Sequence, residues 1–399
     1  MHVSIIAGSL DLTGAGSNIS LDILARTLTE YGHNVEVITI DPTGSNALTY
    51  DTPYSVSTIS ELVRKKHISS LFNSREFKLL EGKSDIFHIF DPIFAPIFGY
   101  YRYLGGSVPV VCRLNSYTMF CSNTMMMDGN CHKNCSTIDR VRHSESSTGS
   151  KVFKSPLFLI SSLSIPDVVN SIDKFFAQSP SVKNIYEETG IDPQKIKVIT
   201  NFYDPDFGEP NTERKVDFER DCFNVLYVGR VKEKKGVDLL LDASQHSEFD
   251  LTIDIVGDGE ARASLETQAK SLSIGDNINF HGWVDHDDLK NYYGQSNLFV
   301  QPSRWVEPSG RALLEAMQYN CPAVVSNIGG PPWIVGNAGL VFEKNNSKDL
   351  ANKIDLLYKN KEKYKDLRRK CSSRIDGFNP EKIIREIEEE YISATSNGY

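Results

Sequence analysis

Two glutamates, Glu307 and Glu315, stand where the sequence pattern changes from strand to helix. The apolar run NLFVQPS ends just before Glu307, and ALLEAM continues as a helix. Because α/β sheets bind ligands at the carboxyl ends of their strands, this junction is a candidate binding site. Pro308 suits the first helical position, and the amides of a helix start attract anions. Four consecutive residues are expected to turn their amides toward a diphosphate: Ser309, Gly310, Arg311 and Ala312.

The spacing of the two carboxylates suits an extended ligand. An ideal helix would separate Glu307 from Glu315 by about 12 Å at ~1.5 Å per residue, roughly the span from the sugar of a nucleotide-sugar to its ribose. A carboxylate accepts two hydrogen bonds, as paired sugar hydroxyls require, and Glu307 can also meet positive charge developing at an anomeric carbon. For an arbitrary pair of glutamates, two solvated carboxylates beside an amphipathic helix would be the favoured alternative.

A cationic loop follows the first strand of the same half of the chain. Arg230 and Lys235, in GRVKEKKG, can clamp a diphosphate, the arginine as a fork and the lysine as a point charge. Alone, such a loop is usually solvated surface. The later loop FHGWV ends at Val284, where backbone groups can meet a nucleobase.

Composition limits the classes of protein and partner. The chain has 399 residues, is 40% hydrophobic and carries a net charge of -9, which predicts two globular domains and argues against nucleic-acid binding. No apolar stretch reaches the ~20 residues that a spanning helix needs. The first residues resemble a buried strand rather than a signal peptide, and seven cysteines suggest reduced thiols, so we expect a cytoplasmic protein.

Apolar runs alternate with helical segments in both halves, which predicts an α/β fold with parallel sheets. The runs typical of strands lie at residues 3–6, 35–40, 86–90, 108–114, 174–177 and 197–199, and again at residues 223–228, 251–256, 278–280, 298–300, 323–326 and 340–342. A polar, unpatterned stretch at residues 201–222 marks the boundary. We expect an N-terminal domain at residues 1–203 and a C-terminal domain at 204–379, with an amphipathic helix in 380–399 packing back on the first.

Together these motifs resemble the retaining glycosyltransferases of family 4. The similar segments include HNVEVIT, DIFHIFDP, KVITNFYDPDF, GRVKEKKGVDLLLDA, DIVGDGE, LFVQPSRWVEPSGRALLEAM and SNIGGPPWIVGNAGLVF. The resemblance implies the GT-B fold, two facing Rossmann-like domains. It also implies transfer of a sugar from a UDP- or GDP-sugar to an acceptor hydroxyl with retention at the anomeric carbon, without a metal or other cofactor. Glycan, polysaccharide or glycolipid synthesis is the expected setting.

The resemblance also assigns roles to residues. It implies that Arg230 and Lys235 meet the diphosphate, that Glu307 and the amides after it meet the donor sugar, and that Glu315 meets the ribose. Gly16 falls at the family's glycine loop, which approaches the donor phosphates. His88 matches a histidine that lines the cleft, and an imidazole can donate to phosphate or hydroxyl oxygens near neutral pH.

Departures from the family pattern keep other functions open. The usual glycine pair is Ala15-Gly16 here, Trp333 replaces a glutamate, and Asn115 replaces a second histidine that contacts the donor. Asparagine can hydrogen-bond but cannot carry charge. A non-catalytic nucleotide-sugar-binding subunit and a nucleotide-sugar epimerase of the same fold are the alternatives. GAGSNI lacks the third glycine of a dinucleotide fingerprint, so a dehydrogenase is disfavoured.

Three further patterns have two interpretations each. Cys121, Cys131 and Cys135 can hold a metal or belong to a loop ordered by packing or a disulfide, and the second is favoured. Of two Asp-x-Asp patterns, residues 204–206 lie in the domain crossing, and Asp285 with Asp288 is typical of a helix N-cap. IFGYYRYL and VFKSPLFLI fit core helices, but also peripheral contact with the inner membrane face and a lipid-linked acceptor.

Overall fold

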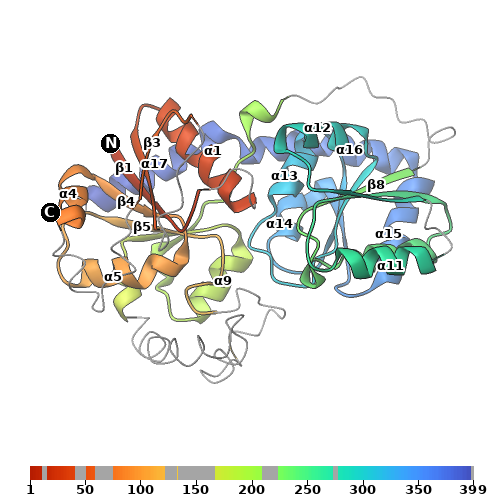
Figure 1. The fold of residues 1–399 in the computed structure, drawn as a ribbon, viewed down its shortest axis with the longest axis horizontal. Helices are drawn as coiled ribbons and strands as arrows, with labels where there is room; N and C mark the ends of the chain where they lie inside the picture. Colours follow the sequence, from red (N-terminus) through yellow and green to blue (C-terminus); the bar gives the residue numbers. More distant parts are fainter. Residues whose placement is uncertain are drawn as a thin grey trace. The chain divides into compact units, whose positions relative to one another are not determined.

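The computed structural model describes residues 1–10, 16–40, 51–58, 75–121, 133, 167–208, 223–272 and 277–396. The chain divides into two compact units (Figure 1). Unit 1 contains the described residues before position 201 together with those from position 383 onward, and unit 2 contains the described residues from 201 to 382.

Unit 1 is built on a seven-stranded parallel sheet in the order β3-β2-β1-β4-β5-β6-β7. Its strands are β1 (His2–Ala7), β2 (Asn34–Thr39), β3 (Ser55–Thr58), β4 (Ile86–Ile89), β5 (Val110–Leu114), β6 (Lys174–Ala177) and β7 (Ile196–Val198). Its described helices are α1 (Gly16–Glu30), α4 (Arg75–Lys83), α5 (Ala95–Tyr103) and α9 (Pro180–Glu188), and α17 (Pro380–Ser396) enters it from unit 2. Apart from His2, every residue of the central strands β1, β4 and β5 is buried, as expected for parallel strands covered by helices on both faces.

Successive residues of β4 face opposite sides of this sheet. Phe87 packs against Phe98 and Tyr101 of α5, with ring centres 5.3 and 5.7 Å apart. His88 points to the other side and meets Tyr391 of α17. The two-residue period of the strand therefore attaches α5 to one face and α17 to the other.

Unit 2 has a six-stranded parallel sheet in the order β10-β9-β8-β11-β12-β13. Its strands are β8 (Phe223–Val228), β9 (Leu251–Val256), β10 (Ile278–Gly282), β11 (Leu298–Gln301), β12 (Ala323–Ser326) and β13 (Gly339–Phe342). Its helices are α10 (Val237–His246), α11 (Arg262–Ser271), α12 (His286–Gln295), α13 (Arg311–Gln318), α14 (Pro331–Val335), α15 (Ser347–Lys359) and α16 (Lys361–Ile375). One core layer joins α10, α11 and α15 to the sheet, and a second joins α12, α13, α14 and α16 to its other face (Figure 1).

The observed strands confirm the predicted α/β class and parallel sheets. β3 was not predicted, because Ser55–Thr58 contains one apolar residue and none of its side chains is fully buried. As an edge strand it packs one side only against a neighbour, so it needs no apolar run. Within the described part of the chain, no helix is long and apolar enough to cross a membrane.

Candidate functional site

Glu307 and Lys235 form a close ion pair at the carboxyl end of the unit 2 sheet. Lys235 Nζ lies 2.7 Å from Glu307 Oε1, and the Ser303 hydroxyl also donates to that oxygen. Burial acts to raise the pKa of Glu307, but the charge and hydrogen bond of Lys235 and the Ser303 hydroxyl outweigh it, so this pKa lies below its ordinary value. The carboxylate is therefore held anionic while only 6% of the residue is exposed.

The backbone around Glu307 is fixed by a close approach of the 328–330 turn. The amide of Gly330 donates to the Glu307 carbonyl at 2.8 Å. Gly329 has a φ of +73°, and a Cβ there would lie 2.4 Å from the same carbonyl oxygen. Only glycine fits this position, so the turn holds Glu307 in one place.

The helix after Glu307 starts later than predicted. α13 begins at Arg311 with Gly310 as its N-cap, so Pro308 does not occupy the first helical position. The ideal-helix distance between the two glutamates therefore does not apply, because residues 307–310 are not helical. A helix starting at Arg311 still directs its first amides outward from the carboxyl edge of the sheet, which suits an anion. Ser309 is buried, and its hydroxyl has no hydrogen-bond partner among the described residues.

Glu315 lies inside unit 2 and is bonded through both oxygens. His286 Nε2 lies 3.0 Å from Oε1, and the Tyr293 hydroxyl donates to Oε2 at 2.9 Å. Burial acts to raise the pKa of Glu315, but His286, Arg311 and Tyr293 together hold it below its ordinary value. Each carboxylate oxygen has two lone pairs, so Glu315 can still accept a ribose hydroxyl.

The remaining predicted donor residues differ in exposure. The Arg230 side chain is exposed and makes no ion pair within the described ranges. Ala312 and Val284 are half-buried, and Arg311 donates to the Phe202 carbonyl at 3.2 Å. Gly16, in unit 1, is the exposed first residue of α1. Arg230 is therefore an exposed cation at the carboxyl end of β8, and its contact with a phosphate stays a prediction.

Three loops at the carboxyl ends of β8, β9 and β10 are tied together, and we call residues 229–231, 257–261 and 282–284 the rim. The Gly257 amide donates to the Gly282 carbonyl at 2.7 Å, and the Val231 amide donates to the Asp258 carbonyl at 2.9 Å. Gly257 has a φ of +122°, and a Cβ there would lie 2.0 Å from the Gly229 carbonyl oxygen. The loops are therefore interlocked through their backbones.

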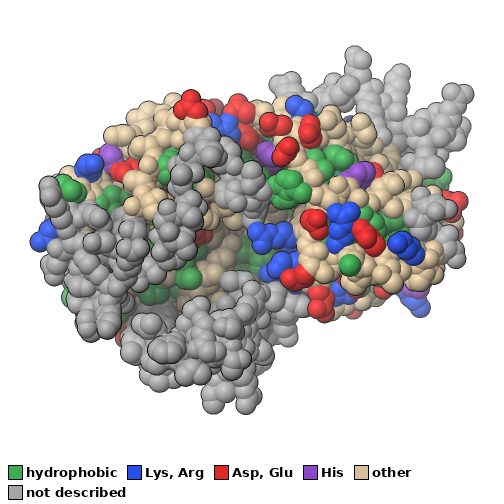
Figure 2. All heavy atoms as spheres, in the orientation of Figure 1, with side chains coloured by type: hydrophobic (Ala, Val, Ile, Leu, Met, Phe, Trp, Pro, Cys, Tyr) green, Lys and Arg blue, Asp and Glu red, His purple; other side chains and the backbone are tan. Residues whose placement is uncertain are grey.

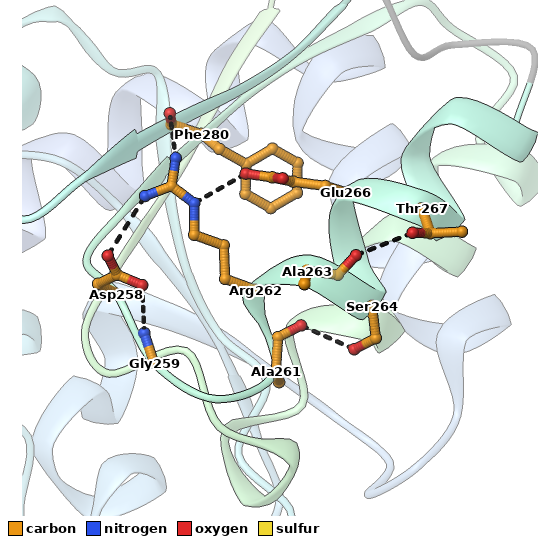
Figure 3. Close-up of polar contacts among 9 residues, drawn as sticks. All are labelled: Asp258, Gly259, Ala261, Arg262, Ala263, Ser264, Glu266, Thr267 and Phe280. Carbon is orange, nitrogen blue, oxygen red and sulfur yellow. Dashed lines mark hydrogen bonds and ion pairs between the residues drawn. The ribbon is translucent and has the colours of Figure 1, made fainter.

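Arg262, the first residue of α11, adds a side-chain clamp to the rim (Figure 3). Its guanidinium lies 3.4 Å from Asp258 and 2.8 Å from Glu266, and it donates to the Phe280 carbonyl at 3.4 Å. One arginine fork thus connects the loop after β9, the helix that follows it and the end of β10. The clamp fixes the strand that leads directly to Val284.

The resemblance implies that His88 lines the cleft, whereas the structure buries it inside a strand. It lies within β4, is 0% exposed, and bonds through Nδ1 to the Tyr391 hydroxyl. Burial, and secondarily the charge of Arg113, holds the pKa of His88 well below its ordinary value. His88 is thus a buried, neutral imidazole that bonds to α17, and its role in the candidate site stays a prediction.

Asn115, directly after β5, lies at the carboxyl edge of the unit 1 sheet. Its Nδ2 donates to the Phe90 carbonyl at 2.8 Å. Asp91, after β4, lies at the same edge and accepts the Gly8 amide at 2.6 Å. The side-chain amide of Asn115 therefore helps to set the end of β4.

The proposed metal patterns are only partly described. Cys121 is a free, half-buried thiol, whereas Cys131 and Cys135 lie outside the described residues. Within the described ranges, no group of three or more His, Cys, Asp or Glu side chains could hold a metal ion. Asp204 caps a short 3-10 helix by accepting the Asp206 amide. Asp285 occupies the N-cap of α12, but its side chain makes no capping bond, so the capping prediction is wrong in that respect.

Sequence reasoning missed the residues that hold the two glutamates. Ser303, His286 and Tyr293 all bond to them, and the Trp305 ring lies 4.7 Å from Lys234 Nζ and 5.3 Å from Lys235 Nζ. Ser303 precedes Glu307 by four residues and could have been found from that spacing. His286 and Tyr293 are 29 and 22 residues from Glu315, and no local pattern connects them.

Two family models match nearly the whole chain. Residues 14–207 match Glycosyltransferase Family 4, and residues 209–374 match Glycosyl transferases group 1. The chain belongs to this family of glycosyltransferases, and its fold is GT-B.

Particular proteins are similar to this chain. An uncharacterised protein in the cps region of Klebsiella pneumoniae is 31% identical over 42% of this chain and 46% of its own length. An Escherichia coli protein named UDP-Gal:alpha-D-GlcNAc-diphosphoundecaprenol alpha-1,3-galactosyltransferase is 29% identical over 54% of this chain and 58% of its own length. This chain thus spans about half the length of these relatives. The crystal structure of Anabaena HepE in complex with UDP covers 98% of this chain and 100% of its own, with a TM-score of 0.72 at 17% identity.

Proposed function

We propose that this protein transfers a sugar from a UDP- or GDP-sugar to an acceptor hydroxyl, with retention of configuration at the anomeric carbon. The observation that carries the proposal is the buried carboxylate of Glu307, held anionic by Lys235 just before the start of α13. A fixed negative charge in a nearly dry site stabilises positive charge developing on a donor sugar. The helix start beside it suits the diphosphate that leaves.

The steps follow from these charges. The bond between the anomeric carbon and the diphosphate oxygen breaks, and the acceptor oxygen bonds to that carbon on the same face. The acceptor proton passes to the leaving diphosphate. Arg230, Lys235 and the first turn of α13 supply the positive charge that the diphosphate requires, and we propose that no metal or other cofactor takes part.

UDP is the donor nucleotide that we favour. A structure with this fold, Anabaena HepE, was crystallised with UDP. Glu315 supports a nucleotide of either base, because a carboxylate held anionic by His286 and Tyr293 can accept ribose hydroxyls. A donor panel decides between UDP and GDP.

The acceptor that we propose is a glycan or a lipid-linked sugar held by unit 1. The similar E. coli galactosyltransferase is named for an acceptor sugar linked to diphosphoundecaprenol. Ile93, Tyr103 and Leu104, in or beside α5, are 56%, 64% and 56% exposed. Apolar and tyrosine side chains of this kind favour a membrane interface, which supports peripheral association with the inner membrane face. Failure to co-sediment with anionic vesicles would contradict this association.

The deciding experiment incubates the protein with UDP- and GDP-sugars and measures donor binding, nucleotide release and the identity of the sugar. Transfer predicts nucleotide release that increases with acceptor and a product with the donor's anomeric configuration. An altered nucleotide-sugar without release would indicate an epimerase, and binding with neither change would indicate a donor-binding subunit. Glu307→Ala should abolish release, and Glu315→Ala should weaken donor binding. If both variants bind donor as the native protein does, the site is wrongly assigned.

A further inference from the structure

A polar pocket of about 630 Å³ lies in unit 2 between the edge of the sheet and α12. Asn224 of β8, Asp254 of β9 and His281 of β10 line it from the sheet. Asp288 and Tyr292 line it from α12. Val284 also lines it, but Glu307, Lys235 and Glu315 do not, so the pocket adjoins the candidate donor site without including its charged residues.

The sheet side of the pocket is an organised hydrogen-bond network around Asp254. Its Oδ1 lies 2.7 Å from His281 Nε2 and accepts Asn279 Nδ2 at 3.0 Å, and its Oδ2 accepts Asn224 Nδ2 at 2.7 Å. Asn224 Oδ1 is buried and has no hydrogen-bond partner among the described residues. The bonds to Asp254 thus hold three polar side chains of the sheet in fixed positions beside the pocket.

The outer side of the pocket offers groups that this chain does not use. Asp285 and Asp288 make no side-chain hydrogen bond or ion pair within the described ranges, although Asp285 is placed to cap α12. Trp283, which also lines the pocket, is 52% exposed. Acidic side chains gather over α12 on the face shown in Figure 2. The exposed indole and the carboxylates without hydrogen-bond partners among the described residues are therefore available to contact a ligand.

The chemistry of the lining selects one class of ligand. Three aspartates and no lysine or arginine line the pocket, which disfavours phosphates and other anions. The described residues contain no group suited to a metal ion. Carboxylates and amides accept from and donate to paired hydroxyls, and an aromatic ring packs against the apolar face of a sugar. We propose that this pocket binds a neutral oligosaccharide segment, as a second carbohydrate site that adjoins the donor site at Val284 but excludes its charged residues.

This inference adds a holding site to the proposed transferase, but sugar binding in the pocket does not depend on transfer. A growing glycan held in this pocket of unit 2 could accept one sugar after another without leaving the protein. An effective local concentration of this kind raises occupancy without new contacts at the reacting centre.

The test measures binding of neutral gluco-, galacto- and manno-oligosaccharides by saturation-transfer NMR on the full chain, with and without saturating UDP. We expect at least one series to bind saturably at millimolar concentration, and UDP to leave that binding unchanged. Trp283→Ala should weaken it about 10-fold, the effect typical of removing an aromatic anchor. Trp283→Phe should restore part of the affinity.

A matched pair of variants on α12 separates the pocket from general charge effects. Asp288→Asn, inside the pocket, should weaken binding, whereas Asp287→Asn, exposed on the same helix outside it, should not. Absence of binding by every series, or binding indifferent to Trp283→Ala, would overturn the proposal. Competition by UDP would also overturn it, because the pocket would then belong to the donor site. Donor turnover by the same samples reports separately on the transferase proposal.

Discussion

Both units bury titratable side chains, but burial has opposite effects on their charge. In unit 1, His88 is closed into the sheet and bonds to Tyr391 of a helix that covers it. In unit 2, Glu307 and Lys235 lie at the carboxyl edge, where a strand has just ended and a helix is about to begin. Burial lowers the pKa of His88 and so removes its charge, whereas Lys235 keeps Glu307 charged despite burial. A buried group indicates a ligand site only where its charge is kept and an edge of the sheet is near.

Lys235→Met should have the largest effect, because it leaves a buried carboxylate without its cation. Breaking a buried ion pair costs about 3–5 kcal/mol, and we expect the lower end because the Lys235 side chain is 21% exposed. Turnover should fall by about 100-fold or more, as when a charge-stabilising group is lost. Chemical denaturation and donor-dependent nucleotide release measure the two losses.

The control and the double variant make this prediction sharp. Lys234→Met also removes a cation from Trp305 but not the bond to Glu307, and should change turnover little. Adding Glu307→Gln to Lys235→Met removes the unpaired charge, so stability should return without activity. Native turnover in Lys235→Met would mean that the pair has a structural role alone.

Tyr391→Phe tests the other side of the comparison. It removes the hydroxyl bonded to His88, and an unmade buried hydrogen bond costs about 1–3 kcal/mol. Stability should fall by that amount, while kcat and donor KM should stay unchanged. Tyr103→Phe, at an exposed tyrosine, is the matched control. A fall in kcat without loss of stability would instead indicate that His88 takes part in the reaction.

The same contrast explains what the sequence could predict. Parallel strands are buried on both faces, so continuous apolar runs marked all of them except β3, which has one apolar residue among four. Glu307 and Lys235 were identified because each lies in a loop between a strand and a helix and matches a motif of the resembled family. The burial of His88 against α17 was not predicted, because its partner Tyr391 is 303 residues away. His286 and Tyr293 were missed for the same reason: contacts across a domain leave no local periodicity.

Arg262→Ala should have a smaller effect, confined to donor affinity. The arginine connects Asp258, Glu266 and the Phe280 carbonyl, and so sets the strand end before Val284. Donor KM should rise several-fold while kcat stays near native, because the rim is loosened but Glu307 is untouched. Arg262→Lys should recover only part of the affinity, since an ammonium cannot reproduce the fork. Lys270→Ala, exposed on the same helix, is the control, and an unchanged donor KM in Arg262→Ala would contradict the clamp.

The smallest expected effect is the acid response of unit 2. The pKa of Glu315 is lowered in the folded chain, so this residue contributes stability above the unfolded pKa of about 4.3, and the contribution is lost as the pH falls through the lower folded value. The glutamine of Glu315→Gln cannot titrate. The unfolding free energy of this variant should therefore depend less steeply on pH between the unfolded pKa and the lower folded pKa of Glu315. Denaturant titrations over acidic pH measure the slope. Equal slopes in Glu315→Gln and the native chain would show that the bonds from His286 and Tyr293 do not hold a charge.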